Sequence, residues 1–242
     1  MKRWVVLAFG LLCYLVTVAV GAYAVFLFSG LIAPAATHPN RIDPGSMGID
    51  LALVALFGLQ HSVMARGWFK HWWTALVTEP LERSVYVLAS DAALALLCWL
   101  WQPIPGDIWD VSDSLASAAI LVVSALGVGV AAISNLQIDH FELLGLRQVW
   151  AYFRGQPYQG IPFRTPGLYR YVRHPMTLGF LIALWATPHL SLDRFVLNAG
   201  LTAYVLLALP WEERDLLQTF GAAYQAYRLR VPRLFPWKGR AI

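Results

Sequence analysis

Charged residues are scarce in this chain, because Asp, Glu, Lys and Arg together make up only 13% of its 242 residues. A soluble globular domain usually carries about 25% of such residues, so this scarcity excludes an ordinary soluble fold. A disordered chain is excluded as well, since 58% of the residues are hydrophobic and 14% are aromatic. With a mean hydropathy of +0.56, the composition is that of an integral membrane protein.

Cysteine and the common metal and nucleotide motifs are also nearly missing. Only Cys13 and Cys98 occur, each inside an apolar stretch, which favours two buried thiols over a disulfide or a metal pair. The absence of HExxH and of paired Cys-His spacing predicts no metal site. The absence of a GxGxxG loop after a strand argues against a soluble dinucleotide-binding domain. The pI is about 9.2, but the basic residues flank apolar segments, so no nucleic acid partner is expected.

Long apolar stretches dominate the chain instead. Six blocks with few or no charged residues lie at residues 4–33, 51–65, 84–102, 114–138, 175–192 and 195–211. A helix needs about 20 residues to cross the hydrocarbon core, which the first and fourth blocks easily supply, whereas the second, fifth and sixth are marginal. The last two blocks, separated only by Asp193 and Arg194, would form a tight hairpin that either crosses fully or stops short.

The backbone in lipid must satisfy its own hydrogen bonds, which decides the fold class. We therefore expect an all-α fold, a polytopic membrane helical bundle with five to six membrane helices and interfacial helices on the cytosolic side. The whole chain, residues 1–242, is expected to form one domain.

The distribution of Lys and Arg predicts the orientation of this bundle. A cytosolic N-terminus leaves only Arg41 and Arg194, among 18 Lys and Arg residues, on the outer side. Lys2 and Arg3 precede an uncharged run that is too long for a cleavable signal peptide, so the first block is a retained span. We expect an integral protein of the cytoplasmic (inner) membrane with both termini in the cytosol.

Two cytosolic segments are expected between the fourth and fifth blocks. Residues 141–154 mix aromatic, aliphatic and charged side chains in the manner of a helix lying in the membrane interface. Residues 155–167 contain three Gly and three Pro, which is typical of a turn-rich connector or lid. Residues 141–174 are thus predicted to form a cytosolic interfacial helix and lid. After the last block, residues 212–230 can form a helix with an apolar side of Leu216, Leu217, Phe220, Tyr224 and Tyr227.

The start of the fifth block has the properties of an anion site. Pro175 suits the first position of a helix, and a residue before proline avoids the helical region, so His174 should cap the helix. The free N–H groups there, with Arg173 beside them, would attract a carboxylate. The alternative is that Arg173 reaches a lipid phosphate and His174 is an ordinary cap. Glu212 and Glu213, just after the sixth block, would pair with these cations or accept from hydroxyl groups.

The run GLYRYVRHPMTLG at residues 167–179 is followed about thirty residues later by EER at residues 212–214. This pair of motifs resembles the C-terminal signature of the isoprenylcysteine carboxyl methyltransferase family of integral membrane methyltransferases. One departure is Thr177, which stands where the family usually carries an aromatic residue. Three further runs are similar to the methanethiol S-methyltransferase branch of that family: residues 60–66 (QHSVMAR), 82–84 (ERS) and 141–150 (FELLGLRQVW).

The resemblance implies a membrane enzyme that uses S-adenosylmethionine as its methyl donor. Its expected reaction is the S-methylation of methanethiol to dimethyl sulfide, with S-adenosylhomocysteine as the other product. Residues 167–230 would bind this cofactor, with the tyrosines covering the adenine or the sulfonium and the acids meeting the ribose. The expected cofactor-binding residues are Tyr169, Tyr171, Val172, Arg173, His174, Gly179, Glu212, Glu213 and Arg214.

Polar groups from distant segments are expected at the same membrane depth. In the predicted topology the side chains of His61, Arg83, Asp139 and His140 all reach the cytosolic leaflet, and ionisable groups at such a depth usually line a functional interior. Methyl transfer to a thiol needs a thiolate, so a histidine is the expected base, with Asp139 available to orient one. His61 is the first choice, because it lies inside an apolar segment where gratuitous polarity is costly.

Other assignments remain open from the sequence. Each histidine also fits an ordinary hydrogen bond at a helix end. The acceptor is open to replacement by another small thiol, a prenylcysteine carboxylate or a phospholipid amine. A non-catalytic membrane protein linked to nitrogen-oxide metabolism is another alternative, against which the retention of both RHP and EER argues. A membrane reductase with a nicotinamide cofactor is a third. The expected partners are the small thiol and membrane lipids, and the oligomeric state is open.

Overall fold

The structure is a computed structural model that describes residues 2–29, 43–113 and 115–236. Residues 30–33 at the end of the first predicted span, Ser114, Arg41, Lys238 and Arg240 lie outside this part. Among the described residues, five helices are long and apolar enough to cross a membrane, which confirms the polytopic helical bundle. They are α1 (Lys2–Ser29), α2 (Pro44–Met64), α4 (Glu82–Leu100), α5 (Leu115–Ile138) and α9 (Leu192–Phe220). Their large apolar side chains are widely exposed, as expected for a surface that faces lipid.

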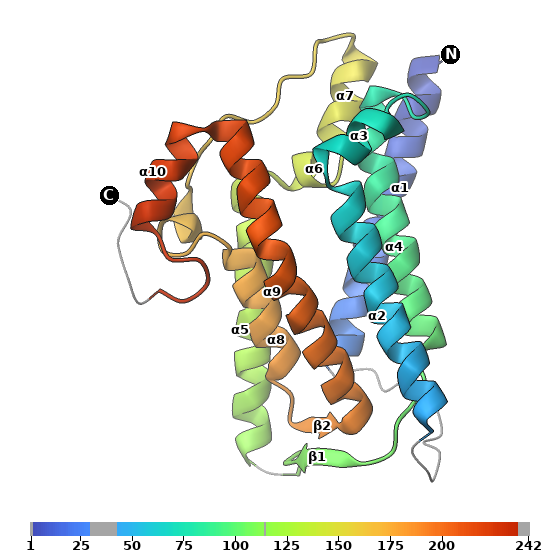
Figure 1. Ribbon diagram of the computed structural model, residues 1–242, viewed down its shortest axis with the longest axis vertical. Coiled ribbons are helices and arrows are strands. Elements are labelled where there is room, and N and C mark those ends of the chain that lie inside the picture. The colour runs from blue at the N-terminus through green and yellow to red at the C-terminus, as the bar shows by residue number, and fades with distance from the viewer. Residues whose placement is uncertain (1, 30–42, 114, 237–242) are drawn as a thin grey trace.

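The long helices stand side by side along one axis (Figure 1). Helix α4 packs against both α1 and α2, α2 packs against α9, and α5 packs mainly against α8 (Pro175–Trp185). Short helices gather at the end that also carries the N-terminus (Figure 1). They are α3 (Gly67–Trp73), η1 (Glu79–Leu81), α6 (His140–Leu143), α7 (Leu146–Arg154), η2 (Gly167–Arg170) and α10 (Ala222–Arg230).

The fifth and sixth apolar blocks differ from the predicted hairpin. Helix α8 has 11 residues, about 16 Å at 1.5 Å per residue, so it is too short to cross the hydrocarbon by itself. Strand β2 (His189–Ser191) follows it and pairs antiparallel with β1 (Asp107–Asp110). Asp193 and Arg194 therefore lie in the first turn of α9 and do not form the turn between two helices.

Two predicted boundaries were also wrong. Helix α9 does not end at Trp211 but continues past Pro210 to Phe220, so the acids at 212 and 213 lie inside a helix. A membrane helix tolerates such a proline because neighbouring groups satisfy the freed carbonyl. The predicted tail helix over residues 212–230 is therefore divided, with α10 starting after Gly221 at φ 55°. Helix α2 starts at Pro44, well before residue 51, because Asp43 accepts from the backbone of Gly45 and Ser46.

The interfacial segment is helical as predicted, but it is broken into α6 and α7 at Gly145, whose φ is 83°. A Cβ at this glycine would lie 2.8 Å from the Ser84 backbone nitrogen, so the break lets the chain approach the start of α4. Residues 156–166 form no helix or strand. Figure 1 shows this segment crossing from α7 toward the side of α10.

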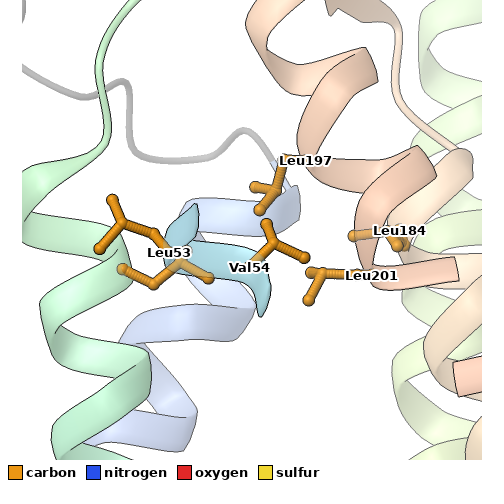
Figure 2. Packing of buried hydrophobic residues seen from close by; sticks show 6 residues of the cluster. Leu53, Val54, Leu184, Leu197 and Leu201 are labelled. Carbon is orange, nitrogen blue, oxygen red and sulfur yellow. The ribbon is translucent and has the colours of Figure 1, made fainter. Parts of the chain in front are cut away.

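The buried core lies between α2, α8 and α9. Figure 2 shows Val54 of α2 facing Leu197 and Leu201 of α9, with Leu184 of α8 beyond them, while Leu53 points to the opposite side of α2. These side chains are at most 8% exposed. Because lipid is as apolar as leucine, close packing rather than escape from water holds such helices together.

Helices α5 and α8 meet through glycine. A Cβ at Gly179 would lie 2.5 Å from the carbonyl oxygen of Gly127, and one at Gly127 would lie 2.6 Å from the backbone nitrogen of Ala183. The absence of side chains lets the two backbones touch, as is typical of membrane helix pairs. This contact fixes the position of α8, and with it the residues that precede Pro175.

Candidate active site

A buried carboxylate organises the site at the start of α8. Glu213 is 2% exposed, and its Oε1 accepts from Arg173 Nε at 2.8 Å and lies 3.3 Å from His174 Nε2. Its Oε2 accepts from Arg233 Nη2 at 2.8 Å. One acid of α9 thus connects the residues before α8 to the segment after α10.

The segment after α10 also binds this site through its backbone. The N–H groups of Arg173 and His174 donate to the carbonyl oxygens of Pro232 and Arg233 at 2.9 and 3.1 Å. Arg173 Nη1 donates in turn to the carbonyl of Val231 at 3.0 Å. Residues 173–174 are therefore held on one side by α9 and on the other by residues 231–233.

The neighbouring acid is differently placed. The side chain of Glu212 is 53% exposed, and its Oε1 lies 3.8 Å from His174 Nδ1. Burial, followed by the nearby Glu212 charge, raises the pKa of the Tyr169 hydroxyl above its ordinary value. Tyr169 is consequently a neutral phenol near an available carboxylate at physiological pH.

An aromatic cluster that includes two tyrosines of α10 packs beside this region. Tyr224 and Tyr227 pack against Phe163 and Phe220, and the Tyr227 hydroxyl donates to the Tyr169 carbonyl at 2.6 Å. Through Phe163, the predicted lid is attached to α9 and α10.

Further contacts fasten both ends of the lid. Arg164 donates to the carbonyl of Ile138, and the Tyr158 hydroxyl donates to the Glu142 carboxylate. Burial and this bond raise the pKa of Tyr158 to about 12. The segment over residues 156–166 therefore follows α5, α6 and the C-terminal helices rather than standing free.

His61 lies in a second polar group, between α2 and α4. Its Nδ1 is 3.1 Å from Ser90 Oγ, and its Nε2 is 3.0 Å from the Tyr86 hydroxyl. The ring stacks on Phe57 and meets the ring of Tyr204 edge to face. Sequence reasoning identified His61 but missed Tyr86 and Ser90.

Arg83, Asp139 and His140 have other partners. Arg83 Nε donates to the carbonyl of Leu143 at 3.0 Å, and its guanidinium lies 5.2 Å from the centre of the Tyr86 ring.

The two ring nitrogens of His140 contact the Tyr14 hydroxyl at 3.1 Å and Asn135 Oδ1 at 3.0 Å. Asp139 has a different set of partners.

Asp139 instead serves the start of α6. Its side chain accepts from the backbone N–H of Glu142 and pairs with Arg147. The polar side chains that were expected to meet at one depth therefore form separate groups, because His61 and His140 share no partner among the described contacts.

The remaining predicted cofactor residues differ in how far their side chains are exposed. Val172 is buried, whereas Tyr171 is 56% exposed. Gly179 lies against the backbone of α5, where helix packing accounts for the glycine. The guanidinium of Arg214 lies 4.8 Å from the ring centre of Trp211 on the exposed side of α9.

Arg233 was missed by the sequence analysis, which used it only as a cytosolic charge. Its local signal is weak, since it follows Pro232 outside any helical pattern. Within the part of the chain that the structure describes, no group of three His, Cys, Asp or Glu side chains is placed to hold a metal ion.

The arrangement combines opposite charges in a small space. Arg173 and Arg233 face the single buried carboxylate of Glu213, which leaves one positive charge in excess. The exposed carboxylate of Glu212 supplies a negative charge nearby. Such a site suits a zwitterionic ligand with hydroxyl groups and an aromatic base, because each part meets a complementary partner.

Comparisons with known proteins agree on one group. The model of the family described as NnrU protein matches residues 51–233. Methanethiol S-methyltransferase from Mycobacterium tuberculosis is 41% identical over 242 residues, which cover 99% of each chain. Methanethiol S-methyltransferase 2 from Bradyrhizobium diazoefficiens is 46% identical over 229 residues, 90% of this chain and 88% of its own. Nurim from Xenopus laevis is 38% identical over 179 residues, 66% of this chain and 59% of its own. No solved structure matches the chain.

Proposed function

This chain belongs to the NnrU protein family, and we propose that it transfers a methyl group from S-adenosylmethionine to methanethiol, forming dimethyl sulfide and S-adenosylhomocysteine. The observation that carries this proposal is the match over 99% of both chains with a methanethiol S-methyltransferase. The similarity thus extends over nearly the full length of both chains.

The charges at the start of α8 fit S-adenosylmethionine. Its methionine part has a carboxylate, for which the excess positive charge of Arg173 and Arg233 and the start of α8 are suited. Its ammonium group and ribose hydroxyls suit the exposed carboxylate of Glu212. The half-buried ring of Tyr169 is suited to the adenine.

Within the proposal, the two acids have different tasks. Glu212 contacts the cofactor, whereas Glu213 positions Arg173 and His174. Val172 and Gly179 hold the backbone in place, and Tyr171 and Arg214 lie at the rim of the site.

The chemistry at the thiol is simple. Bound S-adenosylmethionine supplies an electrophilic methyl group, and the protein has to hold the thiol in line with it and remove the thiol proton. His61 is the proposed base, because it lies within the apolar helix α2, where a polar side chain without a function would be costly. Arg83, beside Tyr86, favours the thiolate by its charge, and Asp139 maintains the start of α6.

The site is proposed to open toward the cytosol, where S-adenosylmethionine is made. This orientation rests on the excess of Lys and Arg at the end of the bundle that carries the short helices. The protein is accordingly assigned to the cytoplasmic membrane with both termini in the cytosol, in contact with lipids.

The reaction is tested with purified protein in lipid vesicles, methyl-labelled S-adenosylmethionine and methanethiol. We expect labelled dimethyl sulfide in the headspace and S-adenosylhomocysteine in solution, with slower product formation by Glu212→Gln. Label that appears only in lipid, or no S-adenosylhomocysteine at all, would overturn the proposed function.

A further inference from the structure

The hydroxyl of Tyr86 contacts the ring nitrogen Nε2 of His61, the proposed base. Tyr86 is 6% exposed, and its hydroxyl lies 3.0 Å from His61 Nε2 and 3.3 Å from the His61 carbonyl oxygen. The shorter contact is to the ring nitrogen. A thiol therefore has no direct access to Nε2 while this bond is present.

The direction of the bonds follows from Ser90. Ser90 Oγ donates to the carbonyl of Tyr86 at 3.0 Å, so its contact with His61 Nδ1 at 3.1 Å requires the imidazole to donate there. His61 then carries its proton on Nδ1, and Nε2 is an acceptor. The Tyr86 hydroxyl therefore donates its hydrogen to His61 Nε2.

Charged groups surround the pair on several elements. The Arg83 guanidinium lies 5.2 Å from the Tyr86 ring centre, and Arg66 and Arg83 both act electrostatically on His61. On α9, the carboxylate of Glu212 and the hydroxyl of Tyr204 act on Tyr86. The pair therefore lies among charged and polar groups from several elements.

We propose that Tyr86 is the catalytic residue that receives the thiol proton and at the same time passes its own proton to His61. The S–H bond breaks and its electron pair stays on sulfur, the Tyr86 oxygen gains that proton, and His61 Nε2 gains the phenolic one. Tyr86 ends neutral and His61 ends as a cation, whose proton later leaves to water. Arg66 and Arg83 oppose a lasting imidazolium but stabilise the thiolate. This proposal rests on the proposed function.

The test compares wild type with Tyr86→Phe, which keeps the ring and its contact with Arg83. We measure kcat/KM for methanethiol from pH 7 to pH 9. General acid-base catalysis contributes about 100-fold or more, so we expect a loss of about 100-fold at pH 7. Because the free thiol ionises without help as pH rises, the loss should shrink to about tenfold or less at pH 9. Tyr204→Phe, which removes the hydroxyl from another ring that meets the same histidine edge to face, should give a ratio to wild type that does not change with pH.

A loss for Tyr86→Phe that stays constant over this range, or no loss, would overturn the proton path while leaving the proposed function intact. Wild-type protein that forms no dimethyl sulfide would instead reject the function, and the proton path with it. If Tyr86→Phe does not fold, as judged by its melting in detergent, His61→Gln serves the same comparison. This variant lacks the proton acceptor, so its loss must also shrink with rising pH.

Discussion

Glu212 and Glu213 are neighbours in sequence, but the helix directs them into different environments. Successive residues of an α-helix point about 100° apart, so one acid faces the interior while the other faces the open side. Both oxygens of Glu213 accept from guanidinium groups. The side chain of Glu212 remains 53% exposed.

This difference predicts separate effects of two otherwise identical substitutions. Glu213→Gln leaves the charges of Arg173 and Arg233 without their partner, so it should lower the free energy of unfolding by on the order of 3 kcal/mol. Glu212→Gln should leave the melting temperature nearly unchanged and weaken S-adenosylhomocysteine binding about tenfold. Thermal melting in detergent and calorimetric titration measure the two quantities. Equal effects of both variants on melting and on affinity would contradict this division.

The sequence predicted this site only in part. Arg173, His174 and the two acids were identified from the proline after His174 and from the end of an apolar block. Arg233 and Tyr86 were not, because their roles depend on contacts between segments distant in sequence, 20 residues for Arg233 with Glu213 and 25 for Tyr86 with His61. A single sequence without pairing information does not specify such contacts.

At the scale of elements, the contact between α5 and α8 predicts the effect of a single methyl group. In Gly179→Ala, the new Cβ would lie 2.5 Å from backbone atoms of Gly127 and Ala131, which cannot move aside cheaply. We expect a loss of about 1–3 kcal/mol in stability, measured by thermal melting. Gly129→Ala is the matched control, because a Cβ there meets nothing within 4 Å.

The same pair of variants distinguishes packing from ligand contact. If Gly179 acts through packing, the folded fraction of Gly179→Ala should bind S-adenosylhomocysteine with wild-type affinity. A normal melting temperature with lost affinity would instead support the direct cofactor contact that the sequence motif indicates.

The tyrosines of η2 and α10 predict how stability depends on pH. Burial raises the pKa of Tyr169, Tyr224 and Tyr227 above the ordinary value of 10.0. Above that pH the folded chain therefore holds more protons than the unfolded chain, so the free energy of unfolding falls as pH rises, whereas near neutrality these groups cause no change.

Denaturant unfolding between pH 7 and pH 11, with tyrosinate absorbance as a second signal, measures this effect. Tyr227→Phe should reduce the slope above pH 10, since one titrating group is removed. Stability that stays constant up to pH 11 would show that these hydroxyls are not protected by the fold.

The elements themselves were predicted with uneven success, for a physical reason. Hydrophobicity located every long helix, because lipid demands an apolar length that few other segments have. It did not locate the ends of α9, since the charged residues after Trp211 mark where the helix leaves the hydrocarbon and not where its hydrogen bonds stop. The short α8 was overestimated because its apolar run continues beyond Trp185 into residues 186–188, which are not helical.

At the scale of the whole molecule, the matches over nearly the full chain confirm the resemblance to methanethiol S-methyltransferases. The side of the membrane on which the site opens is tested with reporter fusions. A fluorescent protein fused after the last residue should fluoresce in bacterial cells, and alkaline phosphatase inserted at Ser112, in the connection after β1, should be active. An active phosphatase at the C-terminus would reverse the proposed topology.

The backbone bonds from Arg173 and His174 to residues 232 and 233 affect how the protein is made. Translation reaches these carbonyl groups only after all five long helices of the described chain have been synthesised. A product of premature termination after α9 can therefore enter the membrane with its full set of long helices and still lack a finished site. If the proposed cofactor site is correct, incomplete chains of this kind would occupy the bilayer without binding S-adenosylmethionine.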